Sequence, residues 1–135
     1  MAAGRTFTLE VMTPDGPVTT AEVSVVILPA ADGELGVLAG HAPVVTLLGA
    51  GVLAFTDSSG KRVQYWASGG FAHIRENALS ALPEECVPLE KLAPAAAQQE
   101  LDTARALPAD TPAAVTRRTA AVTVAQAKLR AAGRA

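Results

Sequence analysis

Cysteine is nearly absent, because the 135-residue sequence contains only Cys86. A single cysteine excludes an intramolecular disulfide and any zinc site built from several cysteines, and it favours a reducing compartment. Histidine is scarce as well, and neither His41 nor His73 has a second histidine or a cysteine at metal-ligand spacing. We therefore expect neither a metal site nor a cofactor.

Long apolar runs are also missing. No stretch reaches the roughly 18 apolar residues of a membrane-spanning helix, and residues 1–5 lead into a strand without the apolar segment of a signal peptide. We therefore expect a soluble protein on the cytosolic side. Aromatic residues make up 4% of the chain although 50% of it is hydrophobic, so the core must consist mainly of Val, Leu, Ile and Ala. The length suits one ordinary domain with a small appendage.

Catalytic motifs are missing too. The sequence has no Gly-x-Ser-x-Gly, and Lys61 is followed by Arg62 instead of the Ser or Thr of a phosphate-binding loop. Cys86 lies beside Glu84 and Glu85, whose carboxylates disfavour a thiolate and make it a poor nucleophile. We therefore expect a binding protein and not an enzyme.

One combination of residues leaves acid–base chemistry open. Asp32 and Glu34 lie close in sequence to His41, and two acids with a histidine can transfer protons. The more common meaning of such a stretch is an exposed acidic loop.

Charge is spread unevenly. The whole chain carries −2, which does not suit a nucleic-acid-binding protein. Residues 1–88 hold four basic against nine acidic side chains, whereas residues 89–135 hold seven against four. This distribution indicates either that the basic tail meets an acidic partner or that it presents a solvated helical face.

The first two thirds of the chain have the residue pattern of an antiparallel β-sandwich or barrel. Short segments with alternating or β-branched apolar residues are separated by turn residues. Pro29 is expected to end the third of these segments. The predicted strands cover residues 7–12, 18–21, 23–28, 44–48, 52–56, 61–67, 72–75 and 78–82.

Residues 32–43 contain three glycines and a proline, and we expect a loop there. Glycines at this density permit backbone conformations with positive φ and the close approach of another backbone. Two meanings remain open from the spacing alone. The loop is either a contact surface on a β scaffold or a structural crossover between two sheets.

Pro88 and Pro94 bracket a linker, and the alanine that dominates beyond them predicts helices over residues 95–106 and 113–132. Thr111 suits an N-cap and the following proline suits the first helical position. Val115, Val122 and Leu129 recur every seven residues and predict a narrow seam between two antiparallel helices. The sequence therefore predicts a β-sandwich domain over residues 1–86, and a linker with a marginally stable helical hairpin over residues 87–135.

The sequence of residues 33–53 closely resembles the signature of the F-type ATP synthase epsilon subunit. It reads Gly-Glu-Leu-Gly-Val-Leu-Ala-Gly-His-Ala-Pro, followed by an apolar strand that ends at Gly-Ala-Gly. Residues 68–71 match the family's glycine corner, residues 7–16 match its opening strand and turn, and the Ala-rich end matches its helical hairpin. Ala39 stands where the family usually has proline, which should loosen the loop without changing its role.

This resemblance implies a non-catalytic subunit of the central rotor, at the cytoplasmic face of a bacterial inner membrane. The sandwich would hold the gamma subunit and sit on the c-ring, and it would reach the membrane only through the complex. The extended hairpin would block rotation in the direction of hydrolysis next to the alpha and beta subunits. By the same resemblance, the contacts are Asp32 and Glu34 for the c-ring, His41, Ala42 and Pro43 for gamma, and Arg117, Arg118, Lys128 and Arg130 for beta.

Some members of the family fold the hairpin over ATP with an Ile/Leu-Asp-x-x-Arg-Ala motif early in the first helix. This chain fits that string at residues 101–106, but the motif should begin near Leu92. We therefore expect no ATP sensing, although Asp102 and Arg105 would be the nucleotide contacts if the displaced motif worked, with Arg117 and Arg118 as further phosphate ligands. The rival functions are a free-standing nucleotide-sensing module and a small β-sandwich enzyme.

Overall fold

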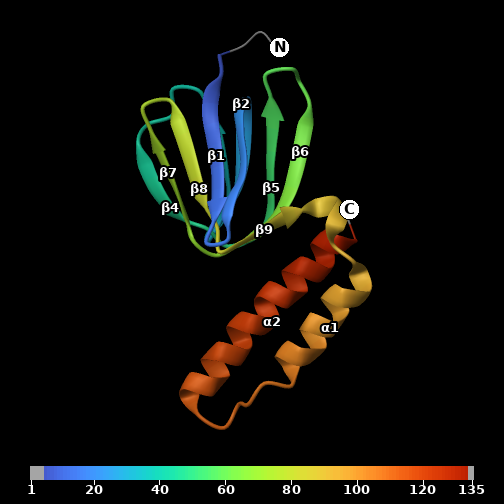
Figure 1. Cartoon of the computed structure of the whole chain (residues 1–135). Helices are drawn as coiled ribbons and strands as arrows, with labels where there is room; N and C mark the ends of the chain where they lie inside the picture. The colour runs from blue at the N-terminus through green and yellow to red at the C-terminus, as the bar shows by residue number, and fades with distance from the viewer. Residues whose placement is uncertain (1–4, 134–135) are drawn as a thin grey trace. The chain divides into compact units, whose positions relative to one another are not determined.

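The computed structural model describes residues 5–133, so the predictions for residues 1–4 and 134–135 lie outside the described residues. The chain divides into two compact units, Met1–Val87 and Pro88–Ala135. The described part of the first unit is built from strands and that of the second from helices (Figure 1). The predicted fold class, a sandwich followed by a two-helix hairpin, is confirmed.

The strands of the sandwich are connected by hydrogen bonds in one continuous order. Their order is β4-β7-β8-β1-β2-β5-β6-β9, with β3 paired to β2 outside this path. The pairing of β1 with β8 is parallel, and the other described ladders between named strands are antiparallel. The bounds are β1 Phe7–Thr13, β2 Gly16–Ala30, β3 Gly33–Leu38, β4 Val44–Leu47, β5 Ala50–Asp57, β6 Arg62–Ser68, β7 Phe71–Arg75, β8 Ala78–Leu82 and β9 Glu85–Pro88.

Strand β2 belongs to both layers of the sandwich. Its first half pairs with β1, and its second half pairs with β3 and β5. A register shift between Val23 and Val25 inserts one extra residue at the crossing point. Because side chains alternate along a strand, this bulge lets both Val23 and Val26 point into the core although they are three residues apart.

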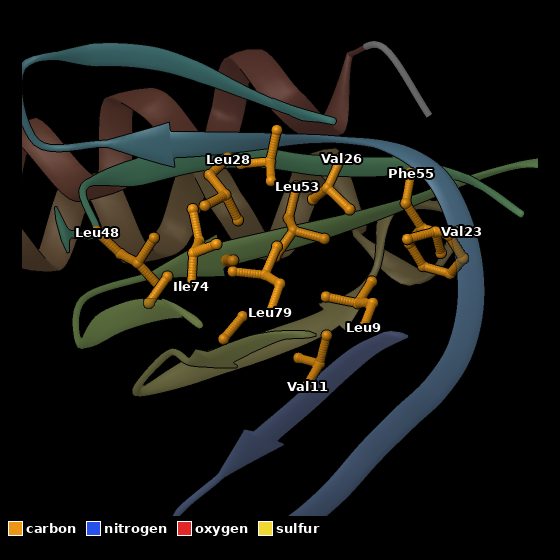
Figure 2. Packing of buried hydrophobic residues seen from close by; sticks show 14 of the residues in the cluster. Leu9, Val11, Val23, Val26, Leu28, Leu48, Leu53, Phe55, Ile74 and Leu79 are labelled. Atoms are coloured by element: carbon orange, nitrogen blue, oxygen red, sulfur yellow. The ribbon is translucent and has the colours of Figure 1, made fainter. Parts of the chain in front are cut away.

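The core lies between the layers and consists mainly of aliphatic side chains, as the scarcity of aromatics predicts. Figure 2 shows Leu9, Val11, Ile74 and Leu79 on one side of it, with residues of β2 and β5 opposite. The largest fully buried side chains of this cluster include Leu9, Leu28, Leu53 and Leu79. The alternation read from residues 7–12 therefore identified a true core strand.

The prediction that Pro29 ends a strand is wrong, because β2 runs unbroken from Gly16 to Ala30. The Pro29 carbonyl accepts from the Gly49 amide at 2.7 Å, on the side of β2 where β5 lies, and the β2–β5 ladder has already ended at Ile27. In an extended strand the N–H and C=O of one residue point to the same side. The missing N–H of Pro29 therefore removes no ladder bond to β3.

The predicted loop over residues 32–43 is also partly wrong, because its first half forms strand β3. Val37 is fully buried and Leu35 packs against the core, whereas Glu34 and Gly36 are exposed. This is the alternation of a half-buried strand. The glycines concealed this pattern in the sequence. Gly36 occupies an outward-facing position of β3, where a side chain would contact nothing.

The second unit begins with a 3₁₀ turn, η1 (Leu89–Lys91), and continues with α1 (Pro94–Arg105) and α2 (Pro112–Ala132). The Thr111 hydroxyl accepts from the Ala114 amide at 3.0 Å, so the predicted N-cap is confirmed. The helices pack through a cluster built from Leu101, Ala104 and Ala125.

The predicted seven-residue seam is wrong at Val115, whose side chain is exposed. Val122 and Leu129 pack on the hairpin cluster as predicted. The ion pair between Lys128 and Glu100 aligns the two helices, and Figure 1 shows that the start of α2 extends past the end of α1. Val115 therefore has no opposing helix.

Candidate subunit-contact surfaces

The predicted c-ring residues lie at the end of the sandwich that carries the β2–β3 turn. Asp32 is in that turn, Glu34 is the second residue of β3 and pairs with Pro29, and both acids are exposed. Backbone hydrogen bonds tie this end together: Ala31 donates to Leu47 at 3.0 Å and Gly49 donates to Pro29 at 2.7 Å. The two acids are therefore presented on a braced turn.

The predicted gamma residues follow β3 at the opposite end of the sandwich. Strand β3 leaves the β2–β3 turn and runs antiparallel to β2 until Leu38, and the His41 amide then donates to the Leu38 carbonyl at 3.2 Å. The His41 Nδ1 lies 2.8 Å from the Ala42 carbonyl oxygen. His41 is half-buried, whereas Ala42 and Pro43 are exposed.

The structure does not bring the two acids and His41 together. At about 3.3 Å per residue, the first and last residues of the six-residue strand β3 are about 17 Å apart. Direct proton transfer requires hydrogen-bond distance or one bridging water. The acid–base reading of Asp32, Glu34 and His41 is therefore wrong.

A further exposed surface was missed by the sequence reasoning. Val45 and Leu47 of β4 are 63% and 69% exposed, and Phe71 of β7, which pairs with Leu47, is 42% exposed. Val45 and Leu47 point outward together because they are two residues apart on one strand. The signal in the sequence is the uncharged Val-Val-Thr-Leu stretch directly after Pro43, which we read only as a strand. Adjacent exposed apolar side chains of this kind mark contact surfaces.

The four basic residues predicted to meet beta have different environments in the hairpin. Arg117 and Arg130 are exposed, and Arg118 is half-buried. The Lys128 Nζ lies 3.1 Å from the Glu100 Oε1, and the Lys128 side chain is only 11% exposed. In this conformation Lys128 therefore joins α2 to α1, whereas Arg117 and Arg130 face solvent.

The hairpin also carries an open hollow of about 490 Å³ near its interhelical turn. Arg105 from α1 and Arg118 from α2 both line it, so the structure brings these two predicted nucleotide ligands together. Asp102 is not in its lining, and its Oδ1 accepts from the Gln98 side chain at 3.0 Å. The full lining is Arg105, Ala109, Val115, Arg118, Thr119, Val122, Thr123 and Gln126.

The single thiol is poorly suited to nucleophilic chemistry. Burial raises the pKa of Cys86 to about 11, and the negative charge of Glu85 adds to this shift. Glu85 also anchors β9, because its Oε1 accepts from the Trp66 Nε1 at 2.8 Å and from the Ser68 hydroxyl at 3.3 Å. The thiolate is therefore a negligible fraction at neutral pH.

Asp57 also has a shifted pKa, and its role is structural. A hydrogen bond from the Ser59 side chain and one from the Lys61 amide hold the pKa of this carboxyl below its usual value. These bonds close the hairpin between β5 and β6.

Within residues 5–133 no three His, Cys, Asp or Glu side chains are grouped to hold a metal ion. The helices of the same residues include none with the length and apolar character needed to cross a bilayer.

The chain resembles known proteins along most of its length. The family model of the ATP synthase Delta/Epsilon chain, beta-sandwich domain, matches residues 6–88. The ATP synthase epsilon chain of Rhizobium meliloti (strain 1021) is 34% identical over 102 residues, which are 76% of each chain. The ATP synthase epsilon chain of Synechococcus sp. (strain JA-2-3B'a(2-13)) is 41% identical over 99 residues, which are 73% of this chain and 72% of the relative.

Two solved structures have a similar arrangement of elements. A chain of the Euglena gracilis mitochondrial ATP synthase, from the OSCP/F1/c-ring complex, superposes with a TM-score of 0.78 at 28% identity, covering 93% of this chain and 82% of that one. A chain of the Tetrahymena thermophila mitochondrial ATP synthase superposes with a TM-score of 0.69, covering 90% and 95%. The second is only 13% identical, so the likeness is one of fold.

Proposed function

The chain belongs to the F-type ATP synthase epsilon subunit family, and from this membership we propose that it is a non-catalytic subunit of the central rotor. In this role it couples the gamma subunit to the c-ring during proton-driven ATP synthesis. It is peripheral to the membrane, at the cytoplasmic face of a bacterial inner membrane, and attaches there only through the complex.

The observation that carries the proposal is the placement of the two predicted contact sets. Asp32 and Glu34 lie at one end of the sandwich and residues 41–43 lie at the other. The ends are joined by strands around one continuous core. A close-packed sandwich deforms little under load, so it can hold two partners at a fixed separation and transmit torque between them.

The acidic end suits the c-ring, because exposed carboxylates on a braced turn can bind polar loops without refolding. The opposite end suits gamma, because Ala42 and Pro43 are exposed and continue directly into the exposed apolar residues of β4. The two contacts therefore differ in chemistry as well as in place.

We assign the hairpin the restraint of ATP hydrolysis. Arg117 and Arg130 already face solvent and can meet an acidic segment of beta, together with the half-buried Arg118. Lys128 can join them only if its ion pair with Glu100 opens. Because the core between α1 and α2 is small, such a rearrangement requires little free energy.

The test is assembly with purified gamma and with the c-ring. Glu34→Lys should weaken binding to the c-ring and leave gamma binding and the circular dichroism spectrum unchanged. Glu10→Lys, a change at an exposed acid on β1, is the matched control. Normal binding of Glu34→Lys to the c-ring would show that the assigned contact is wrong, and unfolding would show that Glu34 is structural.

Removal of residues 89–135 tests the hairpin separately. The truncated sandwich should still bind gamma, and the reassembled enzyme should hydrolyse ATP faster. Unchanged hydrolysis would show that this hairpin is not a brake. A chain that binds neither gamma nor the c-ring would favour the second function, a free-standing nucleotide-sensing module, which the arginine-lined hollow supports.

A further inference from the structure

The turn that leads from β3 into residues 41–43 is a type II β-turn. The His41 amide donates to the Leu38 carbonyl at 3.2 Å, which closes the turn. Gly40 has a φ of 81°, whereas Ala39 is not among the described residues with positive φ. A positive φ at the second central residue alone identifies type II, in which glycine usually holds that position. Gly40 therefore meets the backbone requirement of this turn.

The first central position of the turn lacks the residue that would restrain it. Proline is common there in type II turns, because its ring presets φ and reduces the freedom of the open turn. This chain has Ala39 at that position. The closed turn therefore depends on the hydrogen bond between Leu38 and His41 and on what packs against it.

Arg5 packs against this turn. Its Nη2, Cζ and Nη1 atoms lie 3.2, 3.7 and 3.7 Å from the position that a Cβ on Gly40 would occupy. The guanidinium therefore lies side-on across the bare face of Gly40, because an end-on approach would place Nη1 well beyond Nη2. No hydrogen bond or ion pair joins Arg5 to another residue within 5–133. The contact is one of packing, which a planar and weakly hydrated guanidinium can make.

Asn77 anchors the segment that carries Arg5. The Asn77 Nδ2 donates to the Thr6 carbonyl at 3.0 Å, and the Thr8 amide donates to the Asn77 carbonyl at 3.2 Å. Asn77 lies in the turn between β7 and β8 with a φ of 61°, a conformation that asparagine tolerates better than most residues. The two bonds flank the buried Phe7. Arg5 therefore projects toward Gly40 from a fixed backbone.

We propose that Arg5 is a positioning residue for the gamma contact. Its guanidinium holds the type II turn closed, and it thereby fixes the direction in which the chain leaves β3 toward residues 41–43. The inference deepens the proposed function and rests on it, because these are the residues assigned to gamma. Arg5 acts through Gly40 and the turn, and it needs no contact with gamma itself.

Amide hydrogen exchange followed by NMR on the full chain tests the contact without a partner. Arg5→Ala should speed exchange at the His41 amide about fivefold, since that amide is protected only while the turn is closed. The melting temperature should stay unchanged, because the Arg5 side chain is exposed. Arg62→Ala, at an exposed arginine of β6, is the matched control and should change neither quantity. Equal exchange rates at His41 in all three proteins would overturn the proposal.

Two further variants separate packing from charge. Arg5→Lys keeps the charge, but a compact and strongly hydrated ammonium cannot lie across the glycine, so it should behave like Arg5→Ala. Slow exchange restored by Arg5→Lys would assign the effect to charge and contradict the proposal. Asn77→Gly keeps a backbone that permits positive φ and loses only the donor to Thr6. It should speed exchange at His41 in the same direction, by about twofold.

A proline supplies the rescue. Ala39→Pro added to Arg5→Ala should restore slow exchange at His41, because the ring provides the restraint that the guanidinium provided. Ala39→Pro alone should change the exchange little, because Arg5 already holds the turn. If Ala39→Pro alone speeds the exchange, the comparison of Arg5→Ala with Arg5→Lys decides instead.

Binding to purified gamma connects the turn to function. Arg5→Ala should bind gamma about threefold to tenfold more weakly, because the open turn must be ordered on binding, and Ala39→Pro should recover the loss. Weaker binding with unchanged exchange at His41 would show that Arg5 touches gamma directly, which overturns the positioning role and leaves the rotor role standing. Failure of the unmodified chain to bind gamma would remove the proposed function and the gamma role of Arg5 with it, whereas exchange in the free chain would still report whether Arg5 holds the turn.

Discussion

The sandwich and the hairpin bury side chains of different size, and their cores differ in extent. Among residues 5–133, the sandwich cluster contains fifteen buried hydrophobic residues, most of them Val, Leu, Ile or Phe, whereas the cluster between α1 and α2 contains three, of which two are alanines. Because stabilisation scales with the apolar area removed from water, at about 25 cal/mol per Å², the sandwich should be much the more stable. The difference suits a rigid coupling body that carries a regulatory segment able to rearrange.

The largest expected effect comes from a cavity in the sandwich. Leu9→Ala removes a fully buried side chain, so it should lower the free energy of unfolding by about 2–5 kcal/mol. Chemical denaturation followed by circular dichroism measures this change. Leu38→Ala, at an exposed position, is the control and should stay within about 0.5 kcal/mol. Equal losses for both variants would contradict the assigned core.

A cavity in the hairpin should have a smaller and more local effect. Leu101→Ala removes the one large side chain among the three buried residues of the hairpin cluster. We expect the α1–α2 contact to loosen, with faster hydrogen exchange in both helices and a sandwich transition shifted by less than about 1 kcal/mol. A loss as large as that of Leu9→Ala would show that the sandwich and the hairpin unfold as one cooperative unit.

The ion pair across the hairpin should contribute less again. Glu100→Gln removes the carboxylate next to the Lys128 ammonium, and we expect the hairpin to lose about 1 kcal/mol, with a smaller loss at high salt. The Glu100 side chain is 51% exposed, so solvent screens the interaction and its contribution stays modest. Asp110→Asn, in the exposed interhelical turn, is the control. Helix hydrogen exchange that is unchanged in Glu100→Gln would show that the pair does not hold α1 to α2.

The smallest expected effect is that of ATP on the hairpin. Arg105 and Arg118 line one hollow, but Asp102 is turned to Gln98 and lies outside its lining. Arg105 is the last residue of α1, where the helix dipole by itself favours a cation. Calorimetric titration of the full chain should therefore show no micromolar binding of ATP. Micromolar binding that Asp102→Ala or Arg105→Ala abolishes would show that the displaced motif works.

The helices and most strands were predictable because their signals are local. The alternation of Leu9 and Val11 describes one face of a strand, and Thr111 with the following proline describes a helix start, whatever the rest of the chain does. Strand β8 was predicted with its bounds unchanged, since turn residues flank it on both sides. The family could also be recognised from residues 33–53, where small and apolar residues follow one another in a specific order.

Only the tertiary structure decided which of these elements are neighbours. Pro29 is tolerated in β2 because the β5 ladder has already ended there, and Val115 is exposed because α1 is too short to reach it. The placement of Glu34 and His41 at opposite ends follows from the conversion of a glycine-rich segment into a strand. Sequence periodicity specifies the face that a residue occupies, but pairing between distant segments specifies what lies opposite that face.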